Sequence, residues 1–458
     1  MEPILTKPIS DRREFIRDAL GAAALGALGG CNAVKPGGSG AAGGAAAASP
    51  ISAINTASTI STEGTAGTAS AAGSTTAAAK SSEELIGYPY PGWTPGELDI
   101  HLIHTGTGEN TFMIFPDGTT MLLDCGYNRR RPPDYADAIP PAPDGTRRGG
   151  EWVRRYIERL GARREIDYLV VSHWHADHFA GIPDVSRTFR FLNYYDHQYP
   201  DVGKYRLNAD MWDFDQFQSW LTTALGRGMK REPFNVGALN QIRLRFDPWG
   251  KYGESFSIRN IAANGVVWDG KDGLVDCAAE HVKATGATGI QENMLSSVLL
   301  IRYGAFSYFT GGDLEGGFVG ADGKSYLYEA RVGEVAGPVQ VCKTNHHAYW
   351  TAMQDGFVKA VRPKLFVSSS WSPNQQNLET LKRMMSPENY EGTRFVAYGA
   401  IPDFRMREFR ENGLDKCLTP AGHSVVKVEP GGAAFKLYTL SAADESMRVI
   451  GVREFTCS

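Results

Sequence analysis

Residues 172–178 read Ser-His-Trp-His-Ala-Asp-His and constrain the fold of this chain more than any other segment. Three of the ten histidines stand here, and Asp177 separates the second from the third. Imidazole and carboxylate groups are the side chains that bind zinc and similar divalent ions. The mainly apolar residues 166–171 precede the histidines and predict a buried strand that ends at them. We therefore expect a metal centre at a rigid strand end, and a surface cluster of histidines is the alternative.

The first 31 residues predict an export signal. Arg12 and Arg13 precede an uncharged stretch, 19–30, that is too short to span a bilayer as a mature helix. This pattern resembles the twin-arginine signal, and Leu-Gly-Gly-Cys at 28–31 resembles a bacterial lipobox. The resemblance implies an exported bacterial lipoprotein, anchored to a lipid bilayer through lipidated Cys31, in the periplasm or on the cell surface. A plain secretory signal with an incidental cysteine is the alternative.

Residues 32–92 predict a disordered tether, and residues 93–458 predict the folded domain. The tether is mainly Ala, Gly, Ser and Thr, with too few large apolar side chains to offset the entropy of ordering. The formal net charge of the chain is -4, so no stable nucleic-acid complex is expected. The chain has no Gly-x-Ser-x-Gly and no Walker-type loop, which argues against serine hydrolases and nucleoside triphosphatases.

Strand and helix patterns alternate in both halves of the folded domain. Alternation and short apolar runs predict strands at 98–103, 111–115, 120–123, 166–171, 296–302, 306–310, 339–344, 365–369, 423–428 and 434–437. Helical periodicity is clearest at 151–160 and 376–385. Residues 187–290 predict a family-specific insertion with one helix at 211–225, and its many aromatic side chains are expected to pack a local core rather than stack a substrate. The pattern predicts an α+β fold of αββα type, two mixed sheets packed face to face with helices outside.

Metal-type ligands follow four of these strands. Asp124, the 173–178 cluster, Asp313 and His346 each stand at a predicted strand end. A fold that gathers ligands from several strands places them far apart in sequence, as here.

The order and spacing of these ligands resemble the motifs of the metallo-β-lactamase superfamily. The resemblance implies one or two divalent ions, zinc or alternatively manganese. His173 and His175 would bind a first ion, whereas Asp177, His178 and His346 would bind a second. Asp313 would bridge the two ions, and Asp124 would orient the site from behind. The residues expected to carry catalysis are Asp177, Asp313 and His347, with His347 either a proton donor to the leaving group or a structural neighbour of His346.

One histidine of the superfamily pattern is absent. It usually precedes the bridging aspartate, and here Asn293 stands near its place. His197 and His281 are the only histidines between 178 and 313, and both are expected to be surface or local-core residues. The first ion would then be completed by Asn293 or water, or the site would hold one ion.

A narrower resemblance extends over residues 98–430. It is carried by Pro-Asp-Gly at 116–118, Asp-x-Gly at 124–126, Ser-Ser-Val-Leu-Leu at 296–300, Gly-Asp at 312–313 and His-His at 346–347. These motifs look like the hydrolase domain of the DNA-uptake protein ComEC and its free-standing exported relatives, except that Ala348-Tyr349 replaces the usual Gly-Ser.

The resemblance implies a metal-dependent hydrolase that uses a metal-bound hydroxide on phosphodiester bonds. A lactone, β-lactam or other ester hydrolase of the same superfamily is one alternative, because one centre serves many small-molecule substrates. A non-catalytic, lipid-tethered binding protein with a degenerate metal site is the other.

Overall fold

The structure is a computed structural model that describes residues 83–129, 133–200, 214–239, 241–286, 290–316, 318–319, 325–326 and 328–457. The predicted signal peptide with Cys31, and residues 32–82 of the predicted tether, lie outside the described residues. None of the helices in the described ranges has both the length and the apolar character needed to cross a membrane.

The first sheet holds nine of the described strands, in the order β19-β18-β17-β1-β2-β3-β4-β5-β6. Neighbours from β3 to β6 are parallel and the other neighbours are antiparallel, so the sheet is mixed. Its strands are β1 (Leu98–Leu102), β2 (Asn110–Ile114), β3 (Thr120–Cys125), β4 (Glu165–Val171), β5 (Arg190–Asp196), β6 (Lys230–Arg231), β17 (His423–Val428), β18 (Ala434–Leu440) and β19 (Val449–Thr456).

The second sheet holds eight of the described strands, in the order β16-β15-β14-β11-β10-β7-β8-β9. Neighbours from β11 to β16 are parallel, and the rest are antiparallel. Its strands are β7 (Phe256–Ala263), β8 (Val266–Trp268), β9 (Leu274–Asp276), β10 (Val298–Tyr303), β11 (Phe306–Thr310), β14 (Val341–Lys343), β15 (Leu365–Ser368) and β16 (Phe395–Tyr398). A separate small ribbon pairs β12 (Phe318–Val319) with β13 (Ser325–Tyr326).

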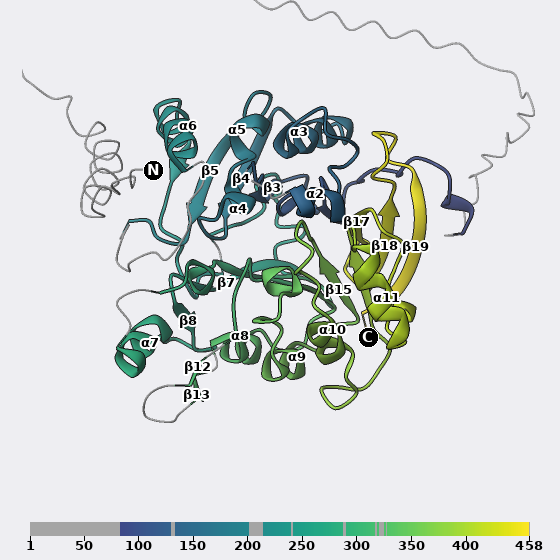
Figure 1. Ribbon diagram of the computed structural model, residues 1–458. Coiled ribbons are helices and arrows are strands. Elements are labelled where there is room, and N and C mark those ends of the chain that lie inside the picture. The colour runs from purple at the N-terminus through teal and green to yellow at the C-terminus, as the bar shows by residue number, and fades with distance from the viewer. Residues whose placement is uncertain are drawn as a thin grey trace, which may run out of the picture.

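Helices cover the outer face of each sheet (Figure 1). Those on the side of the first sheet are α2 (Pro133–Ala138), α3 (Gly149–Arg159), α4 (Ala176–Phe179), α5 (Ile182–Val185) and α6 (Phe214–Gly226). Those on the side of the second are α7 (Cys277–Thr285), α8 (Tyr328–Ala336), α9 (Asp355–Val361), α10 (Leu378–Met385) and α11 (Asp403–Glu411). Short 3₁₀ turns are η1 (Glu83–Leu85), η2 (Glu292–Leu295), η3 (Asn345–Ala348) and η4 (Asp415–Cys417).

The core between the sheets follows the two-residue period of the strands. Leu98, Ile100 and Leu102 of β1 face inward and pack in one cluster with side chains of the second sheet such as Leu299 and Ile301. Alternate residues of a strand point to the same face, so the apolar residues at these positions pack against the facing sheet. Two further apolar clusters lie under the outer helices. The predicted αββα sandwich of two mixed sheets is confirmed.

The predicted insertion at 187–290 contributes strands to both sheets. It supplies β5 and β6 at one edge of the first sheet, and β7, β8 and β9 to the second. The predicted helix is α6, which begins at Phe214, and the segment also contains α7, which the sequence did not predict. The aromatic side chains Tyr194, Phe214 and Phe217 are buried in the apolar cluster beneath α6. As expected, these aromatic residues form core.

The ends of four strands meet where the two sheets adjoin. β3 and β4 of the first sheet run into Cys125 and Ser172, and β11 and β14 of the second run into Gly311 and Thr344. Ser297 N donates to Ser172 O at 2.8 Å. The residue before β10 is therefore hydrogen-bonded to the residue after β4. This junction carries the polar residues singled out in the sequence.

Candidate metal centre

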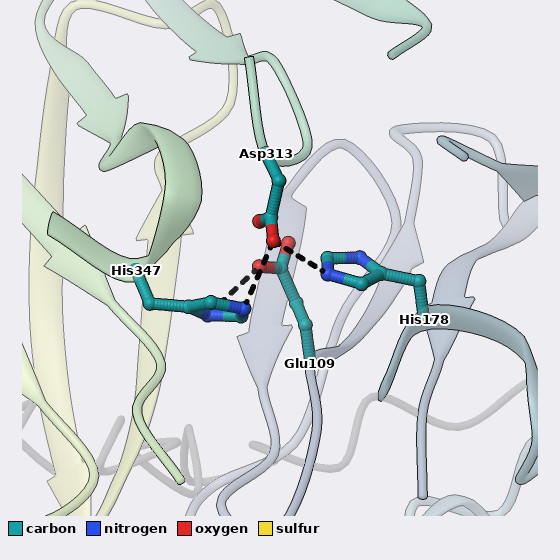
Figure 2. A group of neighbouring side chains, drawn as sticks. All are labelled: Glu109, His178, Asp313 and His347. Atoms are coloured by element: carbon teal, nitrogen blue, oxygen red, sulfur yellow. Dashed lines mark ion pairs between the residues drawn. The ribbon is translucent and has the colours of Figure 1, made fainter. Parts of the chain in front are cut away.

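Four buried side chains converge at this junction: Glu109, His178, Asp313 and His347 (Figure 2). Each offers one ligand atom, and these atoms all lie within 4.8 Å of one another. Glu109 and His178 come from the part of the chain that builds the first sheet, and Asp313 and His347 follow strands of the second. The group is therefore assembled only when both sheets are in place.

Asp313 lies at the middle of the histidines. Its Oδ2 lies 3.2 Å from His178 Nε2 and 3.4 Å from His347 Nε2. His173 Nε2 and His346 Nε2 are each 3.9 Å from the same oxygen. His178 and His347 outweigh the burial of Asp313 and hold the pKa of its carboxyl well below its ordinary value. The oxygen is thus an ionised acceptor facing four imidazoles.

Gly312 allows β11 to deliver Asp313 to this position. Its φ is +54°, and a Cβ atom there would lie 2.7 Å from the side chain of Ser172 at the end of β4. Only glycine combines this left-handed backbone with so close an approach. The Gly-Asp pair therefore reflects the contact between the two sheets as well as the chemistry of the carboxylate.

Asp124 orients His178. Its Oδ2 accepts from His178 Nδ1 at 2.8 Å, and the same carboxylate accepts from Ser172 N at 2.7 Å and Ser172 Oγ at 2.6 Å. Because His178 Nδ1 donates its proton to Asp124, the Nε2 of His178 is directed at Asp313 and Asp177. Burial opposes the charge of His178, but Asp313, Asp177 and Asp124 outweigh it and raise its pKa well above the ordinary value.

His347 is oriented from the other side. Its Nδ1 lies 3.1 Å from the carbonyl oxygen of Ser369, which only accepts, so Nδ1 carries the proton. Its Nε2 then points at Asp177 Oδ2, 3.3 Å away, and at Asp313. Burial opposes the charge of His347, but Asp313 and Asp177 outweigh burial and raise the pKa to about 9.

These groups fit a divalent cation. Among the described residues, His178 Nε2 and His347 Nε2 are buried and make no hydrogen bond, although they face ionised carboxylates. Buried polar atoms without hydrogen bonds are costly. A divalent ion would displace the Nε2 protons and be bound by the two nitrogens and the carboxylate oxygens, which would remove that cost. Imidazole with carboxylate is a ligand set that zinc and similar ions accept.

Asp177 completes the inner group. Its Oδ2 accepts from Trp371 Nε1 at 2.7 Å, and His178 and His347 outweigh burial to hold the pKa of Asp177 far below its ordinary value. The indole therefore anchors this carboxylate from the loop after β15.

His346 lies on the rim of the site. Its side chain is 19% exposed, whereas that of His347 is fully buried. Its Nδ1 lies 3.2 Å from Glu315 Oε1 and 3.1 Å from Thr351 Oγ1. Asn293 Nδ2 donates to Glu315 and lies 3.3 Å from His346 Nε2. Burial is the main cause that lowers the pKa of His346 to about 4.

His173 and His175 interact with each other. His173 Nε2 lies 3.9 Å from Asp313 Oδ2 and 2.9 Å from Nδ1 of the partly exposed His175, which precedes α4. Burial, followed by His178 and His175, holds the pKa of His173 well below its ordinary value. His197, by contrast, pairs with Glu292 at 2.8 Å in the core, and His281 lies on α7.

The structure thus brings together Asp124, His173, Asp177, His178, Asp313 and His347, with His175, Asn293 and His346 around them. Their roles as ligands or catalytic groups stay predictions. Sequence reasoning missed four contacting residues, namely Glu109, Glu315, Lys343 and Trp371. Glu109 stands in a turn-like Gly-Glu-Asn sequence, which carries no signal of a site. Lys343 stands in an apolar strand, where a charged residue is unexpected and could have indicated a role.

Residues 104–259 match the sequence model of the family described as the metallo-beta-lactamase superfamily. No curated protein matches the chain. Among solved structures, the chain is similar to CmlA, a diiron beta-hydroxylase from Streptomyces venezuelae, at 12% identity and a TM-score of 0.36, over 73% of this chain and 55% of that one. A mutant of CmlA matches over 46% of its length, so the chain spans about half of these two relatives.

Two further solved structures are similar over nearly their whole length. Zn(2+)-bound PqqB from Methylobacterium extorquens has 11% identity and a TM-score of 0.35, over 70% of this chain and 96% of that one. A diphosphatase from the PhnP family has 12% identity and a TM-score of 0.31, over 73% of this chain and 97% of that one.

Proposed function

We propose that this chain, a metal-dependent hydrolase with the metallo-β-lactamase fold, cleaves phosphodiester bonds. The observation that carries the proposal is the convergence of His178 Nε2 and His347 Nε2 on Asp313 Oδ2, with no hydrogen bond to satisfy either nitrogen among the described residues. The choice of phosphodiester rests on the proposed relation to the ComEC-type hydrolase domain, whose motifs span residues 98–430.

We further propose that the enzyme works outside the cytoplasm as a lipoprotein anchored through Cys31. The support is the sequence pattern of residues 12–31 alone. The substrate would then be a phosphodiester that reaches the periplasm or the cell surface.

The proposed ligands are Asp177, His178, Asp313 and His347, with zinc or manganese as the ion. When bound there, a divalent ion would polarise a phosphoryl oxygen and lower the pKa of water from about 15.7 toward about 7. The position of His347 between two carboxylates suits a ligand better than a proton donor to a leaving group. His346, which is 19% exposed at the rim, and the neighbouring Asn293 would contact the substrate.

The surrounding residues hold this arrangement before the substrate arrives. Asp124 keeps the Nδ1 proton on His178, and the Ser369 carbonyl keeps the Nδ1 proton on His347. Trp371 fixes Asp177 by its indole N–H. Prepositioned ligands of this kind reduce the reorganisation that a reaction requires.

A substrate panel tests the proposal. The purified full chain, loaded with zinc or with manganese, would be assayed on bis(4-nitrophenyl) phosphate, a γ-lactone and a chromogenic β-lactam. We expect turnover of the phosphodiester, its loss in His178→Ala, and its retention in His281→Ala, which alters a histidine on α7 away from the site. Turnover of only the lactone or the β-lactam would replace the phosphodiester assignment, and no turnover of any substrate with metal bound would favour a binding protein.

A further inference from the structure

Lys343, the last residue of β14, is fully buried beside the metal centre. Its Nζ donates to Gly312 O at 2.5 Å and lies 2.7 Å from Glu109 Oε2. The same ammonium is 3.9 Å from Asp313 Oδ1. A fully buried lysine is rare unless it is paired, and here both of its carboxylate neighbours line the candidate site.

The two oxygens of Asp313 therefore face different cations. Oδ2 faces the imidazoles of His178 and His347, whereas Oδ1 faces Lys343 and makes no hydrogen bond among the described residues. In a centre with two ions, a bridging carboxylate and its neighbours balance the charge of both. Here a fixed ammonium already stands on the Oδ1 side.

The two carboxylate oxygens of Glu109 also have different surroundings. Its Oε2 contacts Lys343 and accepts from Ser369 Oγ at 3.1 Å. Its Oε1 is buried and without a hydrogen bond in the described ranges, although Glu109 belongs to the four-residue group around Asp313. Without the ammonium, Glu109 and Asp313 Oδ1 would be two uncompensated anionic groups in a buried place, and carboxylate oxygens of this kind attract a second divalent ion.

We infer that Lys343 is a resident cation that restricts this centre to one divalent ion, held on the side of Asp313 Oδ2. The repulsion between its ammonium and a second ion a few ångströms away, in a site screened from water, disfavours a second ion. The inference rests on the proposed function only in that the centre must bind a metal. Under this inference Lys343 sets the number of bound ions, which a merely structural partner of Glu109 would not affect.

The test counts metal ions directly. The full chain and two variants would be loaded with Mn²⁺ or Zn²⁺, and bound metal would be measured by elemental analysis and native mass spectrometry. Electron paramagnetic resonance would separate an isolated Mn²⁺ from a coupled pair. Lys343→Gln keeps hydrogen-bond donors for Gly312 O and Glu109 but removes the charge, and Glu109→Gln/Lys343→Gln removes both charges.

We expect one ion in the wild-type chain, two in Lys343→Gln with a coupled Mn²⁺ signal, and one in the double variant. Two ions in the wild-type chain, or one ion in folded Lys343→Gln, would overturn the inference. Two ions in the double variant would also overturn it, because Glu109 would then not be needed for the second ion. If Lys343→Gln does not fold, the wild-type count decides the matter. A wild-type chain that binds no metal would instead contradict the proposed function.

Discussion

Asp124 acts on the centre through His178 and does not face the other ligands. Its carboxylate accepts three hydrogen bonds, from His178 Nδ1, Ser172 N and Ser172 Oγ. Partners of this type fix the ring orientation of a metal-binding histidine and raise its basicity.

Asp124→Asn should therefore weaken binding of Zn²⁺ by about 10- to 100-fold without unfolding the chain. Competition with a chromophoric chelator would measure the dissociation constant. Asp144→Asn is a matched control, because Asp144 is an exposed loop residue whose carboxylate accepts hydrogen bonds from Thr146 N and Thr146 Oγ1, away from the site. An unchanged affinity in Asp124→Asn would contradict the role of Asp124 in orienting His178 for metal binding.

The two adjacent histidines should differ in their importance. His347 is buried and its Nε2 faces Asp177 and Asp313, whereas His346 lies at the rim and its Nδ1 faces Glu315 and Thr351. We expect His347→Ala to weaken metal binding by more than about 100-fold and His346→Ala by less than about 10-fold, because only the first removes an inner ligand. Calorimetric titration of both variants with Zn²⁺ would measure the difference. The reverse order would return His346 to the ligand role that the sequence pattern predicts for it.

The sequence could indicate Asp124, Asp313 and the 173–178 cluster because each directly follows a recognisable strand. It could not separate His346 from His347, because the difference depends on three successive residues with positive φ, His346, His347 and Ala348. Nor could the sequence place Glu109 next to Lys343, which follows it by 234 positions. Such contacts depend on how the two sheets meet, which local patterns do not specify.

At the scale of elements, Glu329 at the start of α8 holds the loop that carries His346 and His347. Its buried carboxylate accepts from Asn345 Nδ2 at 2.8 Å, Met353 N at 2.7 Å and Gln354 N at 2.9 Å. These three donors bracket the left-handed residues 346–348, so one side chain supports a backbone conformation that is unfavourable by itself.

Glu329→Ala should lower the free energy of unfolding by about 1–3 kcal/mol, because three buried donors lose their acceptor. It should also weaken metal binding through the displaced His347. Urea unfolding and metal titration would measure the two effects. Glu334→Ala, at an exposed position of the same helix, should change neither quantity. A loss of stability with unchanged metal affinity would show that the loop keeps its shape without Glu329.

Glu329 also predicts a pH dependence. Burial is the main cause that raises its pKa from 4.5 to about 7. The folded state therefore binds this proton more tightly than the unfolded state, and stability from this group falls as pH rises from about 4.5 to about 7, by at most about 1.4 kcal/mol per pH unit. The wild-type chain should exceed Glu329→Gln in stability most at about pH 4.5 and progressively less up to about pH 7. Denaturant unfolding across this range would measure the trend, and a constant difference would contradict it.

Some of the strands that the sequence did not predict have an interrupted period or are very short. β7 alternates from Phe256 to Ile258, but its register with β10 shifts near Ile261. A bulge moves the following side chains to the other face, so the two-residue pattern breaks within a strand. β6, β8 and β9 are too short for any period to develop. β4, by contrast, could be predicted from its mainly apolar run, and all of its residues after the first are buried.

At the scale of the whole molecule, metal binding should stabilise both sheets together, since each supplies part of the inner group. An ion present at about 100 times its dissociation constant adds about 2.7 kcal/mol to the folded state. Removal of the metal with a chelator should therefore lower Tm by several degrees, and added Zn²⁺ should restore it. Scanning calorimetry would measure the shift, and His178→Ala should show almost none. An equal chelator effect in His178→Ala would point to a metal bound elsewhere.

The division of ligands between the two sheets has a practical consequence. Trp249 is 93% exposed in the connection between β6 and β7, so the chain can be cut there without entering either core. One fragment would carry Glu109, Asp124 and His178, and the other Asp313 and His347, while β17 of the second fragment would pair with β1 of the first. Neither fragment could hold the ion alone. Fused to two interacting proteins, the pair would serve as a split reporter whose signal returns only when the fragments reassociate.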